Sequence, residues 1–185
     1  MSTVGDLAIS RDLRYLGREF LTWLWFQCEV EGGGFELPSG EFDFVVEDNL
    51  AFVGHDEEDS ATAVKGNNPS IRPEAASALA AGMTIRRAKL LIAKGELEWS
   101  LTLDGETLDL RSVKGPPPEA DDPLEQLTER LKRADQIRIA IEELFSRFVE
   151  LRLSSDWDSL ETRRMRDWIR MKLERARADE DRMGE

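Results

Sequence analysis

The chain has 185 residues, of which 25 are Lys or Arg and 38 are Asp or Glu, so its formal net charge at pH 7 is -13. This length suits one substantial domain rather than two, and the acidic balance excludes a surface that attracts nucleic acid or anionic membranes over long range. A single cysteine, Cys28, excludes an internal disulfide, and a single histidine, His55, excludes a metal site built from several histidines of one chain.

The strongest apolar signal is an aromatic segment near the N-terminus. Residues 1–10 are small and mixed and predict a loose lead-in, and a helix is expected from about Asp12 to Glu29. On that helix, apolar bulk would face nearly every side through Phe20, Leu21, Trp23, Leu24, Trp25 and Phe26. Such a helix must be covered on more than one face, so it is either a plain core element or a core element that also forms an interface. The interface candidates are Trp23, Trp25 and Phe26.

A β-hairpin is expected after the three glycines at 32–34, which predict a flexible tether. Alternating residues carry the apolar side chains of its two strands, which are Phe42, Phe44 and Val46, then Leu50, Phe52 and Val53. Residues 47–49 between them offer turn chemistry. The acidic run at 55–59 predicts a solvated loop, because a run of like charges stays hydrated.

Three strands are expected after a short alanine-rich helix that starts at Pro73 and is capped by Gly82. The strands cover 83–93, 97–103 and the segment through Leu108, Leu110 and Val113. Lys94-Gly95 and Asp104-Gly105 supply the two turns, so the pattern predicts a three-stranded antiparallel meander. Its apolar face, which carries Trp99, is expected to lie on the aromatic helix.

Residues 115–118, a glycine and three prolines, predict a stiff spacer before a long helix from Leu124 to Leu151, with Asp122 as its N-cap. An apolar stripe recurs along this helix at alternating spacings of three and four, with Arg138 on the same line: Leu124, Leu127, Leu131, Ala134, Ile141, Phe145 and Phe148. The stripe packs on the sheet or first helix of the same chain, or it forms a helix–helix dimer seam. Phe145 and Phe148 are therefore two further interface candidates.

A last helix is expected to begin at a capping box over residues 155–158 and to reach about Arg177. At about 100° per residue, one side carries four apolar side chains, Trp157, Leu160, Trp168 and Met171. The opposite side carries an arginine stripe of Arg163, Arg166, Arg170 and Arg177. This stripe is the one place where the acidic chain concentrates positive charge along a helix.

Taken together, these elements predict an α+β fold in which an antiparallel sheet, made of the hairpin and the meander, packs on the aromatic N-terminal helix. Residues 1–115 would form this core, and residues 119–185 a helical segment that packs on the core or extends from it. No apolar run approaches the roughly 20 residues that span a bilayer, so no membrane association is expected. The lone cysteine favours the reducing cytoplasm as the setting.

Three segments, in this order, resemble the C-terminal half of the RdgC family of bacterial recombination-associated proteins. They are Glu19-Phe20-Leu21-Thr22-Trp23, the helix from Pro73-Glu74-Ala75-Ala76 to Gly82, and the paired strands with Ala88-Lys89-Leu90 and Trp99-Ser100-Leu101-Thr102-Leu103. The helix from Leu124 to Leu151 is similar to the closing helix of that family. The resemblance covers about residues 16–151 and leaves out the family's N-terminal half, which helps close its ring.

The resemblance implies a role around DNA. RdgC proteins are ring-forming dimers that bind duplex DNA with little regard for sequence and hold back the recombinase that coats single strands. The family has also been labelled an exonuclease, but the sequence shows no clustered carboxylate motif for a catalytic metal. No DNA-contact motif of the family can be placed residue by residue on this chain.

The first functional hypothesis is an RdgC-like, non-enzymatic protein that binds DNA independently of sequence and is linked to the control of recombination or replication. Its candidate phosphate contacts are Arg163, Arg166 and Arg170, with Arg86, Arg87 and Lys89. The alternative for the arginine stripe is a solvated helix face that Asp167 and Glu174 partly neutralise.

The second hypothesis is a protein-interaction or dimerisation module without direct DNA binding, in which aromatic anchors and an acidic surface meet a partner or a second copy. A third, an enzyme with Asp43, Glu47 and Asp56 around a divalent ion, has no ligand spacing to support it. We expect no cofactor and no small-molecule substrate.

Overall fold

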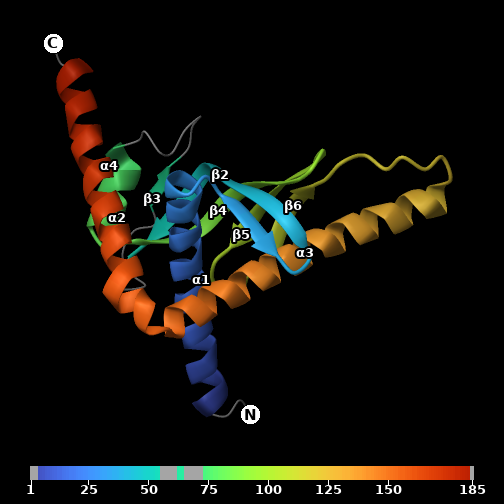
Figure 1. The fold of residues 1–185 in the computed structure, drawn as a ribbon, viewed down its shortest axis with the longest axis horizontal. Helices are drawn as coiled ribbons and strands as arrows, with labels where there is room; N and C mark the ends of the chain where they lie inside the picture. The colour runs from blue at the N-terminus through green and yellow to red at the C-terminus, as the bar shows by residue number, and fades with distance from the viewer. Residues whose placement is uncertain (1–3, 55–61, 65–72, 184–185) are drawn as a thin grey trace.

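The computed structural model describes residues 4–54, 62–64 and 73–183. Its helices are α1 (Val4–Val30), α2 (Pro73–Ala80), α3 (Pro123–Leu153), the π-helical turn η2 (Trp157–Glu161) and α4 (Thr162–Met183). Its strands are β1 (Gly34–Leu37), β2 (Gly40–Val53), β3 (Thr62–Val64), β4 (Thr84–Lys94), β5 (Leu97–Asp104) and β6 (Leu110–Lys114). These elements confirm the predicted α+β fold with two long C-terminal helices (Figure 1).

The strands form one antiparallel sheet in the order β1-β2-β4-β5-β6, with β3 paired to β2. The predicted meander is confirmed as β4, β5 and β6, in which Leu90 lies opposite Leu101 and Leu103 opposite Leu110. Along β1 and the first part of β2, exposed and buried residues alternate, so one face of the sheet is exposed to solvent and the other packs against the core.

The predicted turn at residues 47–49 is wrong, because β2 runs without reversal from Gly40 to Val53. Glu47 lies opposite Lys89 and Ala51 opposite Arg87, so the extra residues of β2 are taken up in a β-bulge. The long strand β4 offers a partner on both sides of the bulge, which lets β2 continue. The hairpin instead joins β1 to β2 through the two residues between Leu37 and Gly40.

The N-terminal predictions also need correction. The first helix begins at Val4 rather than Asp12, so residues 4–10 are helical and not a lead-in. The three glycines are not a flexible tether, because Gly34 starts β1 and the buried Gly33 accepts a hydrogen bond of 2.8 Å from the Phe44 N–H. At Gly33 φ is 75°, and a Cβ there would lie 2.1 Å from the Phe44 carbonyl oxygen.

The second half of α1 is the centre of the core. Phe20, Leu21 and Leu24 are fully buried, and α1 packs across β4 and β2. On its other sides the rings of α1 meet those of the C-terminal helices: Trp25 and Trp168 lie edge to face at 5.2 Å, and Phe20 and Phe148 are 5.6 Å apart. Burial of each large side chain contributes about 1.5–3 kcal/mol, so this helix supplies a large part of the stability.

Two of the helix ends and one strand turn form as predicted. Asp122 caps α3 by accepting from the N–H groups of Leu124 and Glu125 at 2.9 and 3.1 Å. Gly82, with φ of 79°, follows α2 and donates to the Leu79 carbonyl at 3.0 Å. Gly95, with φ of 58°, makes the turn between β4 and β5.

The last helix begins differently from the prediction. Ser154 rather than a residue of 155–158 offers the capping oxygen, to the Asp156 N–H at 3.3 Å, and the first turn is the π-helical η2. Trp157 and Trp168 are buried as expected, but Leu160 and Met171 are 54% and 49% exposed. The buried side of α4 is rotated toward polar residues that the apolar pattern did not mark. No helix in the described ranges has the length and apolarity of a membrane span.

We expect Gly33→Ala to lower the free energy of unfolding by about 1–3 kcal/mol or more, because it adds both a strained φ and a clash with the β2 backbone. The matched control is Gly32→Ala, where φ is 83° but a Cβ meets nothing within 4 Å. Urea unfolding of the two variants measures the difference. Equal midpoints would show that the contact between Gly33 and Phe44 is not rigid.

Candidate nucleic-acid interface and apolar surface

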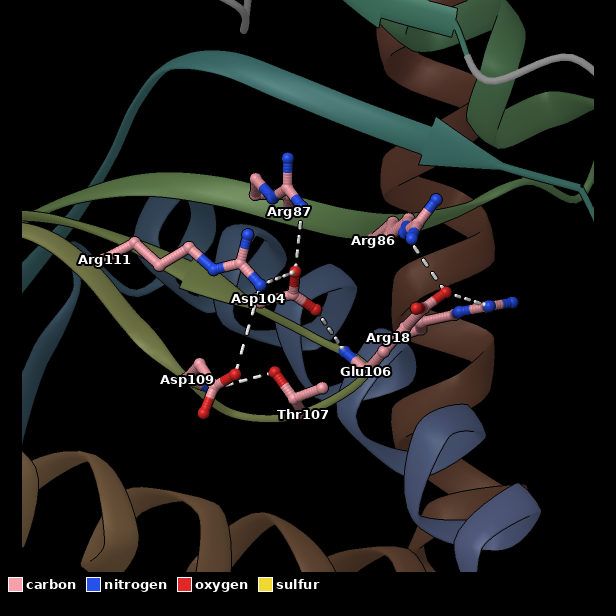
Figure 2. A network of polar contacts seen from close by, with 8 residues as sticks. All are labelled: Arg18, Arg86, Arg87, Asp104, Glu106, Thr107, Asp109 and Arg111. Atoms are coloured by element: carbon pink, nitrogen blue, oxygen red, sulfur yellow. Dashed lines mark hydrogen bonds and ion pairs between the residues drawn. The ribbon is translucent and has the colours of Figure 1, made fainter.

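The β4 candidates for phosphate contact lie beside carboxylates of the same chain. Arg87 pairs with Asp104 at 2.9 Å, and Arg111 approaches the same carboxylate at 3.6 Å (Figure 2). Lys89 pairs with Glu47 on the neighbouring strand at 2.8 Å. A phosphate at either cation would therefore compete with a carboxylate that the fold already provides.

Arg86 belongs to a second ion pair that joins three elements. Its Nε lies 3.2 Å from Glu106, and Arg18 of α1 binds the same Glu106 oxygen. Both Arg18 and Glu106 are largely buried, with side chains 13% and 15% exposed. Because α1, β4 and the β5–β6 loop meet at this carboxylate, the ion pair of Arg86 helps to hold these three elements together (Figure 2).

Asp104 is the buried centre of this network. Burial acts to raise the pKa of its carboxyl, but hydrogen bonds from Arg87 and the Glu106 N–H, with the charges of Arg87 and Arg111, outweigh burial and hold the pKa below its ordinary value. Its Oδ1 accepts from the Glu106 N–H at 3.0 Å and so shapes the β5–β6 loop. The carboxylate is therefore charged at neutral pH and holds β4, β5 and β6 in register.

The α4 candidates differ from those on β4. Arg163, Arg166 and Arg170 all lie exposed, as the predicted stripe requires, and Arg170 pairs with Asp167 at 3.3 Å. Within the described part of the chain, no ion pair involves Arg163 or Arg166. The side chain of Arg177 lies outside the described residues. Within the described residues, Arg163 and Arg166 are thus exposed on one turn of α4 and form no ion pair. The other four candidates each form an ion pair with a carboxylate of the same chain: Arg86, Arg87, Lys89 and Arg170.

The proposed interface aromatics are mostly core residues, which corrects the interface prediction. Trp23, Trp25, Phe26 and Phe148 are between 0% and 2% exposed. Phe145 is half-buried and packs edge to face on Phe20 at 5.3 Å. Because α3 and α4 cover these rings within the same chain, they cannot anchor a partner without unfolding part of the core.

Sequence reasoning missed the buried polar contacts between α1 and α4. Glu161 is 4% exposed and accepts from Trp23 Nε1 at 2.9 Å and from Gln27 Nε2 at 2.6 Å. Arg164 lies 3.3 Å from its other oxygen and also binds Glu31 at the end of α1. The charge of Glu161 is therefore satisfied, which is what permits its burial.

A second ion pair between α1 and α4, in which the lysine is buried, follows about three turns further along α4. Lys172 is 7% exposed, lies 2.7 Å from Glu29, and stands 4.7 Å from the centre of the Trp25 ring. Burial lowers the pKa of Lys172, while Glu29 opposes that shift. Trp168 Nε1 donates to the same Glu29 carboxylate at 3.0 Å. The signal that could have revealed these residues is their spacing, since 161, 168 and 172 share a helical face.

The apolar stripe of α3 divides into a covered and an uncovered half. Its later members Ile141 and Phe148 are buried, whereas Leu124, Leu127 and Leu131 are 72%, 53% and 64% exposed. We call these three residues the leucine face. The N-terminal half of α3 reaches away from the body beside the chain that precedes it (Figure 1). The leucine face is thus the largest run of exposed apolar side chains on one described helix.

Metal-ligating side chains do not cluster in the described part of the chain. No three His, Cys, Asp or Glu side chains there could hold a metal ion together. Asp56, His55 and the acidic run lie outside the described residues, so the proposed grouping with Asp43 and Glu47 is not visible. Burial raises the pKa of the Cys28 thiol to about 12, and the thiol donates to the Phe44 carbonyl at 3.1 Å.

No protein-family model, curated protein or solved structure matches the chain. The resemblance to the RdgC family therefore stays a prediction that rests on the order and pattern of the segments quoted above.

We expect Asp104→Asn to lower the free energy of unfolding at neutral pH by about 1–3 kcal/mol, because a buried, charge-assisted network loses its centre. The folded pKa of Asp104 lies below 3.8, its ordinary value, so its contribution is complete above that value and is lost as the pH falls through the folded pKa. When the pH is lowered from about 6 to about 3, the free energy of unfolding should therefore fall less for the variant than for the parent.

Urea titrations over this range measure the effect. Asp167→Asn is the control, because Asp167 and Arg170 form an exposed pair and its loss should cost under about 0.5 kcal/mol. Parallel pH profiles for the parent and Asp104→Asn would contradict the assignment.

Proposed function

We propose that the protein is a non-enzymatic interaction module that dimerises through the leucine face of α3. The observation that carries this proposal is the exposure of Leu124, Leu127 and Leu131, at 72%, 53% and 64%, on the part of α3 that leaves the body. Contiguous exposed apolar surface of this kind is typical of a protein-interaction site.

The pattern of the helix favours another helix as the partner. The leucine face continues, at the same spacing of three and four, the stripe that Ile141 and Phe148 bury inside the chain's own core. Side chains with this spacing pack as knobs into the holes of a facing helix. A second copy of the chain presents the same leucine face, so a two-fold pair would cover both faces at once.

The energies are consistent with a reversible dimer. Burial of each leucine contributes about 1.5–3 kcal/mol, on each of two chains. Loss of translational and rotational freedom costs about 4–15 kcal/mol, so the leucines must be well covered for the dimer to persist. The resemblance to the RdgC family, whose members are dimers that act around DNA, supports dimerisation and suggests a role in recombination or replication.

The test replaces two leucines of the leucine face with charges, as Leu127→Glu with Leu131→Glu. We expect the parent to sediment as a dimer at micromolar concentrations and the double variant as a folded monomer with an unchanged far-ultraviolet circular dichroism spectrum, because both positions are exposed within the chain. Leu153→Glu is the matched control, since Leu153 is 81% exposed but is not part of the leucine face. A monomeric parent, or a double variant that still dimerises, would refute the proposal.

A second candidate function, sequence-independent DNA binding, is favoured by one observation. Arg163 and Arg166 are exposed on one turn of α4 and, within the described residues, take part in no ion pair. Two guanidinium groups on one turn can contact successive phosphates without reading bases. The net charge of -13 opposes long-range attraction, so binding would depend on low salt.

Fluorescence anisotropy with a labelled duplex at several salt concentrations tests this function. If both arginines contact phosphates, Arg163→Ala with Arg166→Ala should flatten the plot of log K against log salt by about 2, because each neutralised phosphate contributes about 0.9. Arg138→Ala is the control, since Arg138 is exposed but is paired with Asp135 and Glu142. Absence of binding at low salt, or an unchanged slope, would remove this candidate.

A further inference from the structure

The leucine face is flanked by one basic and one acidic side chain. Written as a heptad repeat, Leu124 and Leu131 take position a, and Leu127 takes the position d between them. Beside them, Arg130 takes position g and Asp135 takes position e, and these are the positions that set the orientation of paired helices. The other e and g positions from 123 to 135 are neutral: Pro123 and Thr128. The two flanks of the leucine face therefore carry opposite charges.

Arg130 and Asp135 can each bind a further partner. Arg130 is exposed and, among the residues that the structure describes, takes part in no ion pair. The side chain of Asp135 is 56% exposed, and both hydrogen bonds that Arg138 donates to it, at 3.1 and 2.7 Å, reach the same oxygen, Oδ1. Its Oδ2 accepts no hydrogen bond within the described ranges. Arg130 and Asp135 lie on opposite flanks of α3, so they cannot pair with each other in one chain.

A parallel pair of helices brings these charges together. When two copies of α3 run in the same direction about a two-fold axis, each leucine faces the same leucine of the second copy. Position g of one helix then faces position e of the next heptad on the other helix. Arg130 of each copy therefore meets Asp135 of the other, and the symmetry forms this ion pair twice.

An antiparallel pair would instead place like charges together. In that arrangement each flank faces the same flank of the other helix, so g faces g and e faces e. The register that covers all three leucines sets Leu127 of one copy opposite Leu131 of the other, and Leu124 opposite Ala134. That register brings Arg130 close to Arg130 of the second copy. Like charges across an interface are destabilising, so charge complementarity favours the parallel arrangement.

We propose that the second copy docks on the leucine face in parallel and in register, with an Arg130–Asp135 ion pair on each side of the two-fold axis. This inference rests on the dimer proposed above and adds its orientation. The contact runs from Leu124 to about Ala134, since the next position a holds the charged Arg138. The N-terminal half of α3 leaves the body of each chain, so both bodies lie at the same end of the paired helices (Figure 1).

Cross-linking through an added cysteine tests the orientation. In Ala134→Cys, at an exposed position d, a parallel pair places the two new thiols side by side, so oxidation with copper phenanthroline should link most of the dimer through a disulfide. Lys132→Cys, exposed on another side of α3, is the matched control and should not link within the dimer. The parent should not link either, because burial raises the pKa of its one thiol, Cys28, to about 12.

Exchange of the two charges tests the ion pairs. Arg130→Glu and Asp135→Lys should each raise the dissociation constant of the dimer about tenfold, because each homodimer then holds two like-charge contacts in place of two ion pairs. An equimolar mixture of the two variants should restore the affinity of the parent, since the new glutamate of one chain meets the new lysine of the other. Lys132→Glu is the control, because it changes the net charge as much as Arg130→Glu but should leave the dissociation constant unchanged.

Sedimentation of the parent separates this inference from the dimer on which it rests. A dimeric parent whose Ala134→Cys variant links no better than Lys132→Cys would overturn the parallel orientation and leave the dimer in place. A mixture of Ala134→Cys with Leu124→Cys that links only between the two variants would likewise overturn it, in favour of an antiparallel pair. An unchanged dissociation constant in Arg130→Glu would remove the ion pairs, and a monomeric parent would overturn both the dimer and its orientation.

Discussion

The packing of α4 against the second half of α1 is the contact on which the rest of the fold depends. Alone, α1 would expose aromatic rings on several sides and end with Glu29 and Glu31, whose charge is unfavourable at the negative end of a helix. Lys172 and Arg164 of α4 neutralise both carboxylates, and Trp168 covers Trp25 and Phe26. The same contact therefore removes apolar surface from water and satisfies the charges at the end of α1.

Ion pairs within the chain also limit which basic side chains are available to bind an external anion. In a chain with far more acids than bases, many cations are used to hold elements together, as at Asp104, where Arg87 and Arg111 converge. A cation held in this way adds stability but contributes little to the recognition of an external anion. Arg163 and Arg166 of α4 differ, since within the described residues no ion pair engages them.

Helix α3 serves two purposes along its length. From Ile137 onward it completes the core, and before that point it carries the leucine face away from the body. Arg133 ties the preceding proline segment to this outer half, so the leucine face is presented on a braced helix. The leucine face is therefore exposed on this helix, whereas the fold encloses the aromatic residues near the N-terminus.

The sequence by itself determined the local elements: the meander of β4, β5 and β6, the caps of α2 and α3, and the aromatic centre of α1. Alternation, turn residues and capping side chains act between neighbours in the chain, so they can be recognised without the fold. Only the tertiary structure decided that β2 crosses its bulge without turning, because that depends on pairing with β4. It also decided that Arg86, Arg87 and Lys89 meet carboxylates, and that Glu161 and Lys172 are buried. These outcomes join residues far apart in the chain, and no local pattern records which of them will come together.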